Sequence, residues 1–232
     1  MDFSNFFNTD FLMEIVIVAI PALICITIHE LAHGYTAYRL GDNTAKEMGR
    51  LTLNPIKHID IVGLVMILVV RFGWAKPVPV NMQNFKNPKW YMALTALAGP
   101  LSNILLAVIV LFIFMLLPPP FGGIRALEDV FLSPSPNPVA LIIFYLALIN
   151  IALALFNLLP IPPLDGSKIF FSLLPEKQYY KVLQYERYGM ILLIILVLSG
   201  RFLGFNIFGS LVMQPATNLL LDISLFFSSV LG

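Results

Sequence analysis

Long apolar runs constrain the fold of this chain more than any other feature of its sequence. Of its 232 residues, 59% are apolar and only 12% are charged, whereas a soluble domain carries about 25% charged residues. A helix that spans a bilayer needs about 20 mostly apolar residues, and the runs 11–38, 90–117, 138–159 and 205–231 reach that length. We therefore predict an all-α polytopic membrane protein.

Two further runs raise the expected number of transmembrane helices to about five or six. Residues 188–203 are borderline in length, and residues 59–72 are shorter still. A run as short as 59–72 is typical of a re-entrant or buried segment. We expect a single membrane domain over 1–232, with its polar motifs in 29–168 and its C-terminal helices in 188–231.

The basic residues indicate the orientation, because Lys and Arg are retained on the cytoplasmic side of a membrane. If 59–72 does not cross, eight of the 14 basic residues lie in 39–89 and four lie in 168–187, on the same side. We expect an outside N-terminus, a cytoplasmic segment 39–89, and a location in the cell membrane. A net charge of +1 argues against a nucleic-acid partner.

The string "HELAH" at 29–33 places ionisable residues inside the first apolar run. Such residues are costly in a membrane helix unless they are paired, bind a metal or take part in chemistry. His29 and His33 are four residues apart and share one face of a helix, so both imidazoles can hold one zinc ion. Glu30 lies about 100° further round and can act as a general base toward water at the ion.

A catalytic zinc takes three protein ligands and keeps one position open, so a third ligand is missing from this string. Cys25 is excluded because about 12 Å of helix rise separates it from His33. Two candidates remain open. Asp165 follows a helix that the prolines of "LLPIPPLDG" must end, and His58 follows the turn signal Asn-Pro in "LNPIKHID".

The ordered pair "HELAH" and "NLLPIPPLDG" resembles the site-2 protease family, the intramembrane zinc metallopeptidases of peptidase family M50. The strings "GRLTLNPIKHID", "GWAKPVPVN" and "ALAGPLSN" resemble its short prokaryotic branch, which lacks PDZ domains. The resemblance implies that His29, His33 and Asp165 bind one zinc ion and that Glu30 activates water. It also implies that Asn157 lies near the scissile peptide.

Three interpretations stay open at this stage. His58 matches a string of the same branch, and it either supports a ligand through a hydrogen bond or is itself a ligand. The segment "GWAKPVPVN" is either an edge strand that captures substrate or a proline-rich loop. The small residues of "AGPLSN" favour close helix packing, with Asn103 as a lesser site candidate.

The predicted function is hydrolysis of peptide bonds in or near transmembrane segments of substrate proteins. Those segments and the lipid bilayer are the expected partners, and the sequence does not determine the oligomeric state. The alternatives are a membrane metal transporter or sensor, and a non-catalytic scaffold that retains the His and Asp site. Glu30 discriminates among them, because only the protease needs a base there.

Overall fold

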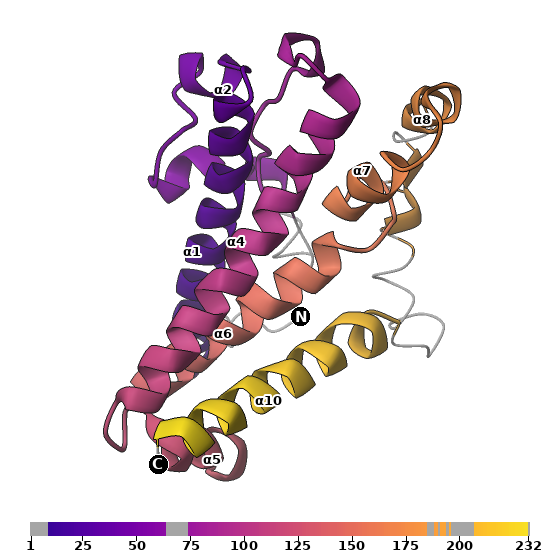
Figure 1. The fold of residues 1–232 in the computed structure, drawn as a ribbon. Helices are drawn as coiled ribbons and strands as arrows, with labels where there is room; N and C mark the ends of the chain where they lie inside the picture. The colour runs from indigo at the N-terminus through magenta and orange to yellow at the C-terminus, as the bar shows by residue number, and fades with distance from the viewer. Residues whose placement is uncertain are drawn as a thin grey trace.

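The computed structural model describes residues 9–63, 74–184, 188, 189, 191–193, 195 and 207–231 (Figure 1). Its α-helices are α1 (Thr9–Arg39), α2 (Thr44–Glu47), α4 (Pro88–Leu116), α5 (Gly123–Leu132), α6 (Pro138–Asn157), α7 (Asp165–Phe171), α8 (Glu176–Leu183) and α10 (Gln214–Leu231). Short 3₁₀ turns lie at η2 (Pro55–His58) and η3 (Met82–Asn84). A π-helical turn, η4 (Gly209–Met213), leads directly into α10.

Four helices in the described part of the chain are long and apolar enough to cross a membrane. They cover Val16–Arg39, Pro88–Leu116, Pro138–Asn157 and Gly209–Leu231. No strand occurs among the described residues, so the prediction of an all-α polytopic membrane protein is confirmed. Most of 59–72 and of 188–203 lies outside the described residues.

The ends of the spanning helices follow from local sequence. Pro88 and Pro138 occupy first helical positions, where a missing amide hydrogen costs nothing. The Asn137 side chain caps α6 by accepting hydrogen bonds from the amides of Val139 and Ala140. At its other end α6 stops at Asn157, shortly before the prolines of "PIPP".

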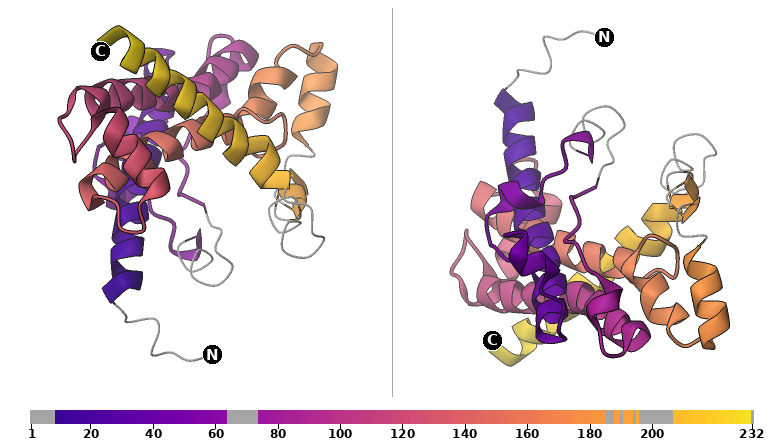
Figure 2. Two further views of the ribbon diagram at one scale, coloured as in Figure 1. Left: turned by 90° about the horizontal axis from the view of Figure 1, so that it is seen from below. Right: turned by 90° about the horizontal axis from the view of Figure 1, so that it is seen from above.

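Helices α1, α4 and α6 pack against one another and form the centre of the bundle (Figure 1). Helix α10 lies across α4 and α6, and α7 packs against α4, as the two further views in Figure 2 also show. Small buried side chains, among them Ala107, Ala147 and Ala154, line these helices. Small residues let membrane helices approach closely, and this close approach brings polar groups of α1 and α4 together.

The edge strand considered for "GWAKPVPVN" is wrong for its described part, 74–81, which has no regular secondary structure. Pro77 and Pro79 have no amide hydrogen to give to a strand ladder. The Val78 amide donates instead to the Glu30 side chain, and the Lys76 amide donates to the carbonyl of His58 in η2. The loop alternative therefore holds.

Candidate metal centre

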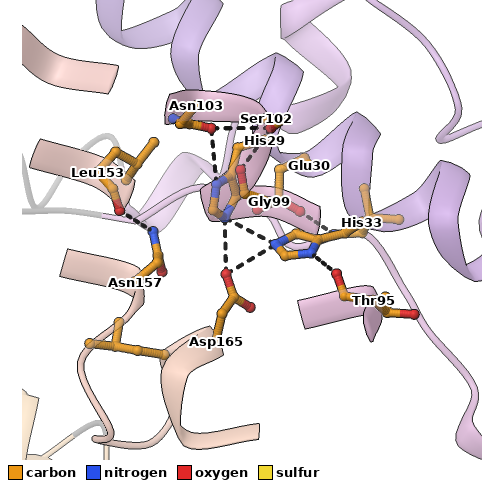
Figure 3. Close-up of polar contacts among 12 residues, drawn as sticks. His29, Glu30, His33, Thr95, Gly99, Ser102, Asn103, Leu153, Asn157 and Asp165 are labelled. Carbon is orange, nitrogen blue, oxygen red and sulfur yellow. Dashed lines mark hydrogen bonds and ion pairs between the residues drawn. The ribbon is translucent and has the colours of Figure 1, made fainter. Parts of the chain in front are cut away.

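Three buried side chains from two distant segments meet at one point (Figure 3). His29 and His33 project from α1, one helical turn apart, and Asp165 is the first residue of α7. As whole residues they are 5%, 9% and 8% exposed. Among the described residues they form the one group of at least three His, Cys, Asp or Glu side chains that could share an ion.

The ligand atoms form a small triangle. The Nε2 atoms of His29 and His33 are 3.0 Å apart, and they lie 3.2 and 3.1 Å from Oδ2 of Asp165. Tetrahedral zinc with bonds of about 2.0 to 2.1 Å requires ligand atoms roughly 3.3 Å apart. The spacing of the three atoms therefore fits three corners of a zinc tetrahedron.

The tautomers of the two histidines leave lone pairs facing one another. His33 Nδ1 lies 2.7 Å from the carbonyl oxygen of Thr95, which can only accept, so this nitrogen carries the proton. His29 Nδ1 pairs in the same way with Oδ1 of Asn103, at 3.2 Å. Both Nε2 atoms are then acceptors, and Oδ2 of Asp165 is buried without a hydrogen-bond donor. Three converging acceptors in a buried site repel one another unless a cation lies between them.

Helix α4 approaches this group through Gly99. A Cβ atom at this position would lie 2.4 Å from Nε2 and Cε1 of His33 and 2.7 Å from Cε1 of His29. Only glycine leaves room for both rings. The same helix supplies the Thr95 and Asn103 oxygens, so α4 fixes the rings that α1 presents.

The turn between α6 and α7 fixes Asp165. A Cβ atom on Gly166 would lie 2.2 Å from the carbonyl oxygen of Leu158, so glycine is required where the chain folds back on itself. Ser167 closes the turn by donating both its amide and its hydroxyl to the Leu164 carbonyl. The backbone therefore holds the carboxylate at the start of α7.

The remaining residues singled out from sequence lie at different places. Glu30 Oε2 accepts a hydrogen bond of 2.7 Å from the Val78 amide. Asn157, the last residue of α6, lies on the Asp165 side of the group in Figure 3 and donates through Nδ2 to the Leu153 carbonyl. Cys25 is outside the group and contacts the Leu146 carbonyl instead.

His58 is not brought to the three-residue group within the described structure. Its ring is 2% exposed and its Nε2 pairs with the Thr52 carbonyl at 2.9 Å, while Nδ1 is buried without a partner. The interpretation of His58 as a zinc ligand is therefore not supported by its position.

Sequence reasoning missed Gly99 and Thr95 and gave Asn103 too little weight. Gly99 and Asn103 are four residues apart in "GPLSN", so they share a face of α4, and an amide inside a membrane helix needs a partner. From that spacing one could have predicted that this face of α4 packs against the histidines of α1. The Thr95 contact is made by a main-chain carbonyl, which every residue has, so the identity of the side chain cannot reveal it.

Known proteins that are similar to this chain are named as zinc metalloproteases. The family model described as Peptidase family M50 matches residues 17–133 and 133–199. A Bacillus subtilis (strain 168) protein named "Putative zinc metalloprotease YwhC" is 41% identical over 199 residues, covering 86% of this chain and 84% of that protein. The Mycolicibacterium smegmatis protein named "Putative zinc metalloprotease Rip2" is 28% identical over 76% of this chain and 64% of its own length. No solved structure matches the chain.

Proposed function

Because this chain belongs to peptidase family M50, the site-2 protease family, we propose that it hydrolyses peptide bonds in or near transmembrane segments of other proteins. The family makes it a zinc metallopeptidase, and its four apolar helices make it a multi-pass membrane protein. One observation carries the proposal: the His29, His33 and Asp165 group lies beside Glu30 and is built partly on a membrane-spanning helix.

In the proposed site, His29, His33 and Asp165 hold one zinc ion. The triangle of acceptor atoms and the buried, donorless oxygen of Asp165 support this assignment. When bound, zinc supplies Lewis acidity that polarises the substrate carbonyl and lowers the pKa of water. The carbonyl of Thr95 and the side chain of Asn103 keep both Nε2 atoms free for the metal.

Glu30 is the proposed general base. It takes a proton from the attacking water and later delivers it to the leaving nitrogen. Its Oε2 is occupied by the Val78 amide, and Oε1 accepts no hydrogen bond from the described residues, so Oε1 is the oxygen available to water. Asn157 is the proposed substrate contact. Its Nδ2 donates one hydrogen to the Leu153 carbonyl, and its second hydrogen can be donated to a peptide oxygen of the substrate.

The proposed substrate is a membrane segment that unwinds locally, since a helix hides its peptide bonds in its own hydrogen bonds. Glycine or proline in the target would ease that unwinding. We propose the cell membrane as the location and the cytoplasmic side as the open side of the site. The basic residues that flank the end of α1 support this orientation.

The test uses purified wild type, Glu30→Gln, Asp165→Ala and His58→Ala in detergent micelles. Zinc content and cleavage of a model transmembrane substrate are measured side by side. We expect Glu30→Gln to keep zinc and lose cleavage by about 10²-fold or more, and Asp165→Ala to lose zinc. Glu47→Gln, an exposed acid in α2, is the matched control.

Two outcomes would contradict the proposal. If Glu30→Gln cleaves at the wild-type rate, Glu30 is not the base. If Asp165→Ala keeps its zinc while His58→Ala loses it, the third ligand is wrong. A metal transporter would retain its metal handling in Glu30→Gln, and this separates that alternative from the protease.

A further inference from the structure

The segment 76–81, "KPVPVN", delivers a single amide to Glu30. Pro77 and Pro79 flank Val78 and carry no amide hydrogen, so Val78 has the one main-chain donor in 77–79. That donor lies 2.7 Å from Oε2 of Glu30, and the Val78 side chain is buried. A hydrogen bond to a carboxylate is among the stronger ones in proteins. The contact therefore fixes one carboxylate oxygen of Glu30.

One end of this segment is anchored by Arg50 and η2. The Lys76 amide donates to the carbonyl of His58 at 2.9 Å. Nη2 of Arg50 donates to the carbonyls of Lys76 and Pro77, at 2.9 and 3.3 Å. Arg50 is 6% exposed, and within the described residues its guanidinium has no carboxylate partner. The buried Arg50 guanidinium therefore holds the two carbonyls that directly precede Val78 in the loop.

The other end is anchored by Asp42. Its Oδ2 accepts from the Asn81 amide at 2.7 Å, and its Oδ1 accepts from the Asn84 side chain at 2.7 Å and from the Thr44 amide at 3.1 Å. Asp42 is fully buried, and its own amide donates to the Ala37 carbonyl at the end of α1. Burial raises the pKa of this carboxyl, but hydrogen bonds from the Thr44 hydroxyl, the Asn81 amide and the Asn84 side chain outweigh burial and hold the pKa below its ordinary value.

We propose that 76–81 is a strap that orients Glu30, and that Arg50 and Asp42 are positioning residues acting on the base through the strap. The inference rests on the proposed function, because it assigns Glu30 as the base. With Oε2 held by Val78, the side chain is restricted to an orientation that leaves Oε1 for water. A strap released at either anchor would let Glu30 sample other rotamers, and catalysis falls steeply with such misplacement.

The first test reads the contact without using activity. Hydrogen exchange at the Val78 amide is measured by mass spectrometry in wild type and Glu30→Ala, each with and without zinc. We expect exchange to be about tenfold faster or more in Glu30→Ala, because a charge-assisted hydrogen bond is lost. Glu47→Ala is the control and should leave exchange unchanged. Equal exchange in wild type and Glu30→Ala would overturn the strap.

The second test separates positioning from structure. Val78→Pro removes the amide donor and replaces the valine side chain with a proline ring. Val78→Ala removes most of the same side chain and keeps the amide donor, so it is the matched comparison. We expect Val78→Pro to lower kcat about 10- to 100-fold, with KM within about twofold and zinc content unchanged. Val78→Ala keeps the donor to Glu30, so its loss of kcat should be much smaller than that of Val78→Pro. Arg50→Gln should lower kcat in the same way, with partial rescue in Arg50→Lys.

Loss of zinc in Val78→Pro, or an equal loss of kcat in Val78→Ala, would mean that the strap only supports the fold, and the inference would fail. If the wild type does not cleave at all, the proposed function fails. The exchange experiment still decides whether Glu30 holds Val78, since it needs no turnover.

Discussion

Gly99→Ala tests whether the approach of α4 sets the metal site. The added methyl would lie 2.4 Å from the ring of His33, while ordinary contact starts at 3.4 Å, so the ring must retreat by about 1 Å. A zinc ligand tolerates a displacement of about 0.2 Å. The His29 ring, 2.7 Å from the methyl, is displaced as well. We therefore expect zinc affinity to fall at least 100-fold, or about 2.8 kcal/mol.

The assay is a zinc titration of purified protein in micelles against a chromophoric chelator, with helix content followed by circular dichroism. Alanine is a better helix former than glycine by about 0.5 to 1 kcal/mol, so a loss of zinc cannot be ascribed to a weaker helix. Leu101→Ala, at an exposed position of α4, is the matched control. It should bind zinc as the wild type does.

Wild-type zinc affinity in Gly99→Ala would refute the reasoning. It would mean that α4 can move away by about 1 Å without disturbing the ligands. The Thr95 and Asn103 contacts, which come from the same helix, could then not be what orients the rings.

Three further predictions concern groups around the site. Asn103→Leu removes the partner of His29 Nδ1 and should weaken zinc binding about 10- to 100-fold, measured by the same titration. Asp42→Asn should be less stable than wild type above about pH 4, where the unfolded carboxyl is ionised. The gap should close as the pH falls through the lowered folded pKa, measured by thermal unfolding in detergent. Gly166→Ala should displace Asp165 and lower zinc content, because its methyl would meet main-chain oxygen 2.2 Å away.

Much of the fold was predictable because bilayer physics leaves few alternatives. Apolar runs of about 20 residues can only be helices in lipid, and each of the four long runs overlaps a described spanning helix. Their ends were readable where proline or asparagine marks them, as at Asn137 and Pro138. The strand alternative for 74–81 failed because Pro77 and Pro79 have no amide hydrogen, and the Val78 amide between them donates to the Glu30 side chain of α1.

The candidate site was predictable only for those residues whose side chains themselves could bind the metal. The i, i+4 spacing of His29 and His33 follows from helix geometry, and the structure brings Asp165 to them. The open choice between Asp165 and His58 could not be closed from residue chemistry, because both can bind zinc. Their positions differ through tertiary packing: η2 holds His58 against the Thr52 carbonyl, away from the group.

The contacts that orient the site come largely from the backbone, which explains why sequence patterns hide them. The Thr95 carbonyl fixes the tautomer of His33, and the Val78 amide fixes one oxygen of Glu30. Each depends on what neighbouring residues lack: a Cβ at Gly99, and amide hydrogens at the prolines beside Val78. Each polar side chain that is buried in a membrane site costs free energy. Backbone groups are present in any case, so they supply hydrogen bonds without adding another polar side chain. The glycine and the prolines are therefore as much a part of the proposed chemistry as the ionisable residues they position.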